Sequence, residues 1–195
     1  LIIPVHNGGE SFRRCMEGVS SAVSPECEII VVADGESDGS WKIADAFGAR
    51  TFTLPESMGP ARARNSGARV ANGEILFFID ADVVVKPETV RKVLSSFEEA
   101  PEIAALFGSY DDAPAAGNFL SQYKNLLHHF VHQTSREDAA TFWSGCGAIR
   151  RDVFRRMGGF DEGYHRPSIE DVELGYRLKR AGYRIRLVKE IQVTH

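Results

Sequence analysis

The sequence has few cysteines and no excess of basic residues, and each scarcity argues against a class of protein. Its three cysteines, Cys15, Cys27 and Cys146, lie far apart and form no CxxC pair. This spacing argues against a disulfide framework or a zinc site and is typical of a reducing compartment. The net charge is −4, whereas general nucleic-acid binding requires a basic surface. We therefore expect no nucleic-acid partner.

The sequence also lacks long apolar runs. No stretch approaches the roughly 20 apolar residues that a membrane-spanning helix requires, and no signal peptide is visible. The chain begins without Met, in "LIIPV", and stops at His195, so we expect a piece of a longer protein. Its 195 residues, 43% of them hydrophobic and 26% charged, have the composition of a single globular domain over residues 1–195.

Short apolar runs alternate with helical stripes over the first hundred residues. The runs cover residues 1–5, 28–33 and 74–79, and "RTFTL" (residues 50–54) resembles a further strand. The stripes cover residues 12–19, 43–47, 61–71 and 90–97. Alternation of this kind is typical of βαβ units. It predicts an α/β fold with a mostly parallel central sheet flanked by helices.

The second half of the chain breaks this alternation. Strands are expected over residues 103–108, 142–149 and 183–188, and a turn is expected over residues 158–162. Apolar residues between Phe119 and Val131 recur at helical spacing, and we expect this stripe to enter the core. Ile169, Val172 and Tyr176 are expected to share one face of a further helix.

Polar side chains follow three of the expected strands. His6 and Asn7 follow the first strand, Asp34 follows the second, and Asp80 and Asp82 follow the fourth. Ligands of parallel α/β sheets bind at the carboxyl ends of the strands, so we expect a shared site there. Two neighbouring carboxylates favour a divalent cation, and oxygen ligands favour Mg²⁺ or Mn²⁺ over zinc. A DxD triplet is short, however, and by itself it also occurs by chance on surfaces.

Two further segments allow more than one interpretation. Asp34 lies in "VVADGESDG", which is typical of a turn and would also suit contact with a nucleotide. The segment "HNGGESF" does not match GxGxxG, which argues against a dehydrogenase. Arg62 and Arg64, in "GPARARNSGA", would suit a phosphate or a base edge, and they would equally suit a solvated helix.

Three carboxylates, Glu170, Asp171 and Glu173, open a helix near the end of the chain. The helix macrodipole alone explains acids at that position. Clustered carboxylates that raise one another's pKa also suit a general base, and the residues alone leave both interpretations open. We expect His128 and His132 on a solvated helix face, because no acid lies close to them in the sequence to complete a metal site.

Five segments, in this order, resemble the family-2 glycosyltransferases with a GT-A fold: "LIIPVHN", "VVADGESDGS", "GPARARNSGARVANGEILFFIDAD", "GGFDE" and "EDVELGYRLKRAGYRI". The resemblance covers nearly the whole chain. It implies a nucleotide-sugar-binding half over residues 1–100 and an acceptor-binding, catalytic-base half over residues 101–195. It also implies metal-dependent, inverting transfer from a nucleoside-diphosphate sugar, usually a UDP-sugar, to a hydroxyl of a sugar, polysaccharide or lipid-linked acceptor.

The resemblance also implies roles for individual residues. The nucleotide-sugar site would comprise Pro4, His6, Asn7, Asp34, Arg64, Asn65, Asp80, Ala81 and Asp82. The acceptor side would comprise Gly145, Cys146, Gly147, Ala148 and Glu170. Trp143 would suit stacking on an acceptor sugar ring, and it would equally suit burial in the core. Asp171 would be the catalytic base, and Mn²⁺ or Mg²⁺ would be bound by Asp82, Asp80 and His195.

Two other functions compete with this interpretation. A nucleotidyltransferase that makes nucleotide sugars would share the sheet and the acids, but "HNGGESF" lacks the basic residue of its phosphate loop. A non-catalytic nucleotide-sugar-binding module would lack one of the two acid sets, and both sets are present. We expect a cytoplasmic protein, with proximity to the cytoplasmic face of a membrane in the full-length protein as an alternative.

Overall fold

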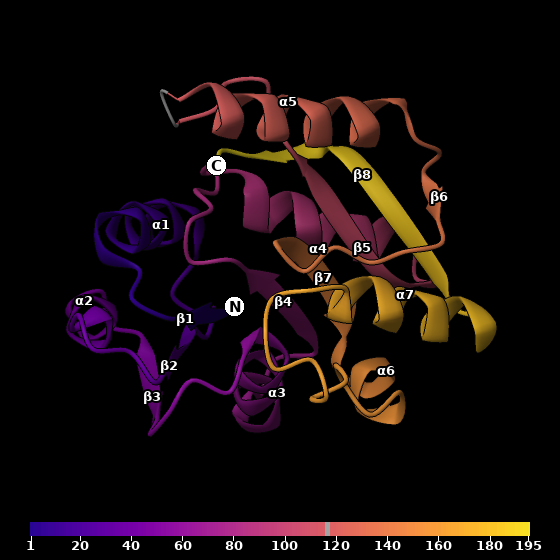
Figure 1. Cartoon of the computed structure of the whole chain (residues 1–195). Coiled ribbons are helices and arrows are strands. Elements are labelled where there is room, and N and C mark those ends of the chain that lie inside the picture. The colour runs from indigo at the N-terminus through magenta and orange to yellow at the C-terminus, as the bar shows by residue number, and fades with distance from the viewer. Residues whose placement is uncertain (116–117) are drawn as a thin grey trace.

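One mixed β-sheet runs through both halves of the chain in the computed structural model, which describes residues 1–115 and 118–195 (Figure 1). Its strands are β1 (Ile2–Val5), β2 (Ile30–Asp34), β3 (Arg50–Leu54), β4 (Ile75–Ile79), β5 (Ile103–Tyr110), β6 (Asp138–Ala139), β7 (Cys146–Arg150) and β8 (Arg184–Val193). They lie in the order β3-β2-β1-β4-β7-β5-β8-β6. The pairs β1–β2, β2–β3, β1–β4 and β5–β8 are parallel. Strand β7 is antiparallel to both β4 and β5, and β6 is antiparallel to β8.

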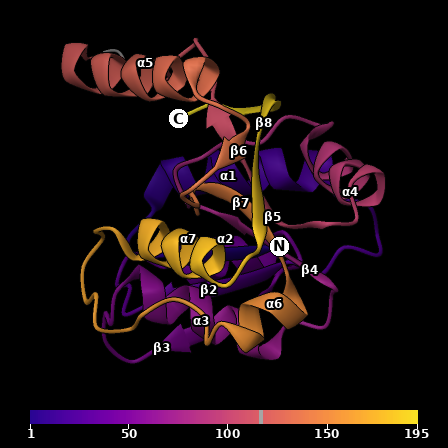
Figure 2. The same cartoon turned by 90° about the vertical axis from the view of Figure 1, so that its right-hand side faces the viewer.

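Helices cover both faces of this sheet, which gives three layers (Figures 1 and 2). They are α1 (Gly9–Ala22), α2 (Ser40–Ala46), α3 (Pro60–Val70), α4 (Thr89–Glu99), α5 (Phe119–Thr134), α6 (Arg151–Arg156) and α7 (Glu170–Arg180). Alternate residues of a strand point to opposite faces. Ile3 and Val5 therefore pack in the core beneath α1, α2 and α4, whereas Ile2 packs in the core beneath α3, α6 and α7.

The expected strands and helices of the first half are confirmed to within a few residues. Strand β3 coincides with the predicted run 50–54, and β2 begins at Ile30, two residues later than predicted. Strands β1, β2 and β4 are apolar and largely buried on both faces, which is what a continuous apolar run predicts. Strand β3, at the edge of the sheet, is only partly buried. In the second half, β8 extends to Val193, beyond the predicted end at residue 188.

One expectation about helix orientation is wrong. The apolar stripe of α5 does not enter the core: Phe119 is 80% exposed and Phe130 is 62% exposed. On α7 no burial was predicted; Ile169 at the N-cap and Tyr176 are exposed, and the buried apolar side chains of that helix are Leu174 and Leu178. Helical periodicity identifies which residues share a face, but it does not tell whether that face meets the protein.

Within the described residues, no helix combines the length and the apolar character needed to cross a membrane.

Candidate functional site

An open cavity of about 980 Å³ lies at the carboxyl ends of the parallel strands. Most of the site residues predicted from the sequence line it: Pro4, His6, Asn7, Asp34, Arg64, Asp80, Ala81, Asp82, Trp143, Glu170 and Asp171. Strands β1, β2 and β4 and the start of α7 therefore bring residues from both halves of the chain to one place. The size of the cavity is in the range that ligand sites of enzymes occupy.

Arg64 on α3 links two carboxylates that are far apart in the sequence. Its Nη2 lies 2.6 Å from Asp80 Oδ1, and its Nη1 lies 2.8 Å from Glu170 Oε1. The side chains of Arg64 and Glu170 are each 5% exposed, and Glu170 Oε2 also accepts a hydrogen bond from the Ser168 amide. Buried charges need such pairing, since an isolated one is costly. The bridge joins the acid that follows β4 to the first turn of α7.

Asp171 is held beside this bridge by the segment that leads into β7. Its Oδ2 accepts hydrogen bonds from the amide of Ser144, at 3.0 Å, and from the Ser144 hydroxyl, at 3.2 Å. Burial raises the pKa of the Asp171 carboxyl, although the Ser144 amide and the charge of Arg64 act in the opposite direction. Ser144 has no local signal in the sequence that would predict this role, because its partner lies 27 positions away.

The backbone of β7 runs alongside that of β4 at the edge of the cavity. Ile79 is paired with Cys146, and one residue further the Asp80 amide donates to the Gly145 carbonyl at 3.3 Å. The two acids after β4 and the Ser144 that holds Asp171 are therefore carried by neighbouring strands. A Cβ at Gly145 would lie 2.6 Å from the Trp143 ring, so this position has no room for a side chain.

Asp82 and His195 form the exposed part of the acid cluster. His195 Nε2 lies 3.2 Å from Asp82 Oδ2, and the Asp82 side chain is 58% exposed. This hydrogen bond lowers the pKa of Asp82 and raises that of His195. The His195 ring stacks on Tyr110, with ring centroids 4.9 Å apart. The described residues include no set of three or more ligands gathered for a metal, so any cation here would need further oxygen atoms from water or a ligand.

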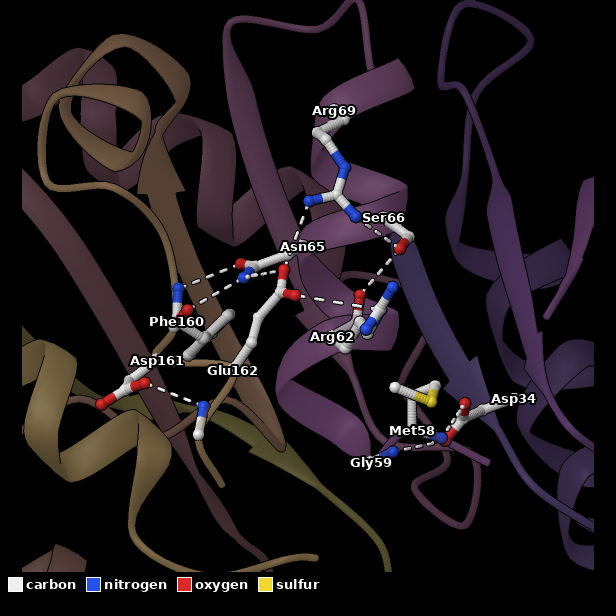
Figure 3. Close-up of polar contacts among 11 residues, drawn as sticks. Asp34, Met58, Gly59, Arg62, Asn65, Ser66, Arg69, Phe160, Asp161 and Glu162 are labelled. Atoms are coloured by element: carbon white, nitrogen blue, oxygen red, sulfur yellow. Dashed lines mark hydrogen bonds and ion pairs between the residues drawn. The ribbon is translucent and has the colours of Figure 1, made fainter. Parts of the chain in front are cut away.

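Asp34 serves the local structure as well as the cavity. Its carboxylate accepts hydrogen bonds from the amides of Met58 and Gly59, at 2.8 and 3.0 Å (Figure 3). It also accepts one from the Ser57 hydroxyl at 3.1 Å. These bonds fix the loop that starts α3, as acceptors do for exposed amides at a helix start. The Asp34 carbonyl lies 2.7 Å from His6 Nδ1, so strand ends β1 and β2 are tied together.

Several predicted site residues lie outside the lining of the cavity. Asn65 donates to the Phe160 carbonyl at 2.8 Å and to Glu162 at 3.0 Å, and its Oδ1 accepts from the Phe160 amide (Figure 3). It therefore anchors the "GGFDE" turn. Arg62 is exposed and lies 3.9 Å from Glu162. Gly145 precedes β7, and Cys146, Gly147 and Ala148 belong to that strand. None of these four residues lines the cavity, and neither does His195.

The expectation of a solvated face for His128 and His132 is wrong. Both residues line the cavity from α5, where they pack on Trp143 with ring centroids 4.9 and 5.4 Å away. Burial lowers the pKa of both imidazoles, that of His132 to about 3. Both rings are therefore neutral at neutral pH, and Trp143 belongs to this wall of the cavity.

Solved structures with the same fold are glycosyltransferases. A mannosyltransferase from Pyrobaculum calidifontis, solved in complex with GDP-Man and Mn²⁺, superimposes with a TM-score of 0.77 at 18% identity, over 100% of this chain and 55% of that chain. The Staphylococcus aureus TarS fragment 1–349, solved in complex with UDP-GlcNAc, gives a TM-score of 0.74 at 18% identity, over 100% and 57% of the two chains. The fold is thus the GT-A fold of glycosyltransferases.

Sequence comparisons identify the family. Residues 1–158 match the family model described as glycosyl transferase family 2, and residues 125–195 match a model described as the N-terminal domain of galactosyltransferase. The chain belongs to glycosyl transferase family 2.

Named relatives extend well beyond this chain. The pre-mycofactocin glycosyltransferase of Mycobacterium tuberculosis is 30% identical over 211 residues, which cover 100% of this chain and 42% of the relative. The probable glycosyltransferase YdaM of Bacillus subtilis is 27% identical over 202 residues, which cover 95% of this chain and 47% of the relative. The chain therefore spans less than half the length of these two relatives.

Proposed function

We propose that this domain transfers a sugar from a nucleoside-diphosphate sugar to an acceptor hydroxyl with inversion at the anomeric carbon. The observation that carries the proposal is the convergence of Asp80, Asp82 and Asp171 on one cavity. Solved relatives in complex with GDP-Man and with UDP-GlcNAc support a nucleotide-sugar donor. We propose a UDP-sugar as the donor, and a sugar, polysaccharide or lipid-linked molecule as the acceptor.

We propose that a divalent cation, Mn²⁺ or Mg²⁺, takes part in donor binding. The exposed Asp82 carboxylate and the neighbouring His195 imidazole would hold it, and diphosphate and water oxygens would complete its shell, as is usual for Mg²⁺. Asp80, already paired with Arg64, would contribute through its free oxygen. When bound, such a cation acts as a Lewis acid toward the negative charge on the leaving diphosphate. Solved neighbours with Mn²⁺ support this choice.

We propose that Asp171 is the general base. Its carboxylate would take the proton of the acceptor hydroxyl as the acceptor oxygen bonds to the anomeric carbon and the bond to the diphosphate oxygen breaks on the opposite face. Its half-buried position and the two hydrogen bonds from Ser144 hold the carboxylate in one orientation. A raised pKa favours proton uptake, and general-base help of this kind contributes roughly 10²–10⁴-fold in rate.

We further propose binding roles for Arg64 and for the aromatic wall of the cavity, which is formed by Trp143, His128 and His132. Arg64 would orient Asp80 toward the donor, because the 2.6 Å contact fixes one of its two carboxylate oxygens. Trp143, His128 and His132 would face the acceptor, since neutral imidazoles and an indole suit the hydroxyls and apolar faces of sugars. The location proposed for the protein is the cytoplasm, at or near the cytoplasmic face of a membrane.

The test is metal-dependent release of a nucleoside diphosphate from nucleotide sugars, measured with and without Mn²⁺. Asp171→Asn should abolish transfer and leave donor binding nearly unchanged, whereas Asp82→Ala should lose metal-dependent donor binding. Asp161→Asn, an exposed acid outside the cavity, is the matched control. Full transfer by Asp171→Asn would remove this residue as the base. Release of pyrophosphate from a nucleoside triphosphate and a sugar phosphate would instead identify a nucleotidyltransferase.

A further inference from the structure

Helix α5 has its polar face toward the protein and its apolar face toward solvent. Asn125 is buried and donates to the His195 carbonyl at 3.2 Å, His129 Nδ1 lies 2.7 Å from the Tyr110 carbonyl, and Gln133 donates to the Lys189 carbonyl at 3.2 Å. The exposed side chains are Phe119, Leu120, Tyr123, Leu126, Leu127, Phe130 and Val131. This is the reverse of an ordinary surface helix, whose apolar stripe faces the core.

The seven exposed side chains form one continuous arc. At 100° per residue they span about 140° of the helix circumference, with Thr134 the one polar residue inside the arc. Together they expose roughly 700 Å² of side chain, more than the largest apolar patch of a typical monomer, which is about 300–600 Å². In both views α5 lies at the outer edge of the molecule, on the far side from α3 (Figures 1 and 2). A patch of this size marks an interaction surface.

We propose that the apolar face of α5 lies on the surface of a phospholipid bilayer that contains anionic lipids. The helix has three aromatic side chains and four aliphatic ones in its arc and no acidic residue along its length, although the chain as a whole has 27 acids. Lys124 borders the arc and is the one Lys or Arg of the helix. An arc of aromatic and aliphatic side chains that is bordered by a cation, on a helix without acids, suits the headgroup region of a bilayer with anionic lipids.

The charges also argue against a second copy of the chain as the occupant. In a two-fold pairing the same patch occurs on both partners. Lys124 would then meet a helix without a single acid. An anionic bilayer offers Lys124 a partner, and another copy of α5 does not.

Docking in this orientation would hold the catalytic cavity beside the lipid surface. His128 and His132, on the inner side of the same helix, line that cavity. The proposal rests on the exposed arc and its charges, and it does not depend on the proposed transfer reaction. Its test is therefore a binding measurement and not an activity measurement.

The experiment is flotation of the purified protein with phosphatidylcholine vesicles, prepared with and without phosphatidylglycerol. We expect flotation that increases with the anionic lipid and decreases with salt. Leu127→Gln should reduce the bound fraction roughly fivefold, and the double variant Leu127→Gln, Phe130→Gln should reduce it more than tenfold. The matched control is Leu94→Gln on α4, because Leu94 and Leu127 are 42% and 47% exposed.

Three outcomes would overturn the proposal. The first is that the unaltered protein does not float with either vesicle. The second is that the double variant floats as well as the Leu94→Gln control. The third is that the unaltered protein is a dimer in light scattering, the double variant is a monomer, and neither binds vesicles. This result would assign the face to a second copy of the chain. Lys124→Glu is a second test that does not alter the apolar arc and is therefore less prone to misfolding. It should weaken binding to the anionic vesicles and leave binding to the neutral vesicles unchanged.

Discussion

Replacing Arg64 by Met should destabilise the fold far more than loss of a surface ion pair. The variant leaves Glu170 buried at 5% exposure without its cation. Removal of one partner from a buried pair costs about 3–5 kcal/mol. Asp80 adds little to this figure, because its side chain is 33% exposed and water screens it. For a chain of this length each kcal/mol shifts the thermal midpoint by about 2–4 °C, so we expect a decrease of roughly 6–20 °C.

The assay is urea and thermal unfolding of Arg64→Met beside Arg184→Met. Arg184 and Glu102 form an ion pair of the same 2.8 Å length as Arg64 and Glu170, but with side chains 60% and 52% exposed. The surface variant should lose no more than about 1 kcal/mol. The double variant Arg64→Met, Glu170→Met should regain most of the loss, since apolar pairs replace buried ion pairs at little cost. If Arg64→Met falls within about 1 kcal/mol of Arg184→Met, the bridge does not hold the two halves together.

Three further predictions follow from the same geometry. Burial raises the pKa of Asp171, so transfer should decline as the pH falls through that pKa. The acid limb of a pH–rate profile should therefore lie above the ordinary Asp pKa of about 3.9. A transfer rate that stays constant down to a pH of about 3.9 would contradict the role of Asp171 as the base. Asp34→Asn should cost about 1–3 kcal/mol in urea unfolding, because an amide has one acceptor oxygen for three donors, whereas the exposed Asp152→Asn should cost less than about 0.5 kcal/mol. Gly145→Ala should displace the Trp143 ring, whose nearest atom would lie 2.6 Å from the new Cβ, and an unchanged near-ultraviolet circular dichroism spectrum would show that the ring has room.

The sequence predicted the parallel half of the sheet well because most of its strands are short, apolar and largely buried. Strand β4, residues 75–79, is apolar throughout and is bounded by the polar residues Glu74 and Asp80. The prediction that the apolar stripe of α5 enters the core failed for a physical reason. Periodicity is a property of one helix, whereas burial depends on a partner surface formed by distant segments. On α5 the face toward the protein is polar, since it lines the cavity.

The candidate site was predictable where it depends on strand ends and not where it depends on long-range pairing. Asp80 and Asp82 were expected at the carboxyl edge of the sheet, and they line the cavity. The contact of Arg64 with Glu170 joins residues 106 positions apart, and no local pattern contains it. Asn65 illustrates the converse: it matched a motif, but all the hydrogen bonds of its side chain go to the turn at residues 160–162.

The lateral pairing of β4 with β7 has a consequence for how such a domain can diversify. The Asp80 amide is bonded to the Gly145 carbonyl, one residue beyond the Ile79–Cys146 pair. The distance between the acids after β4 and Ser144, which holds Asp171, is thus set by the register of the β4–β7 pair. A strand register changes only in whole-residue steps. The segments at residues 111–115 and 161–169 lie outside this ladder. Insertions there could alter substrate range between related proteins while the distance between the two acid sets stays constant.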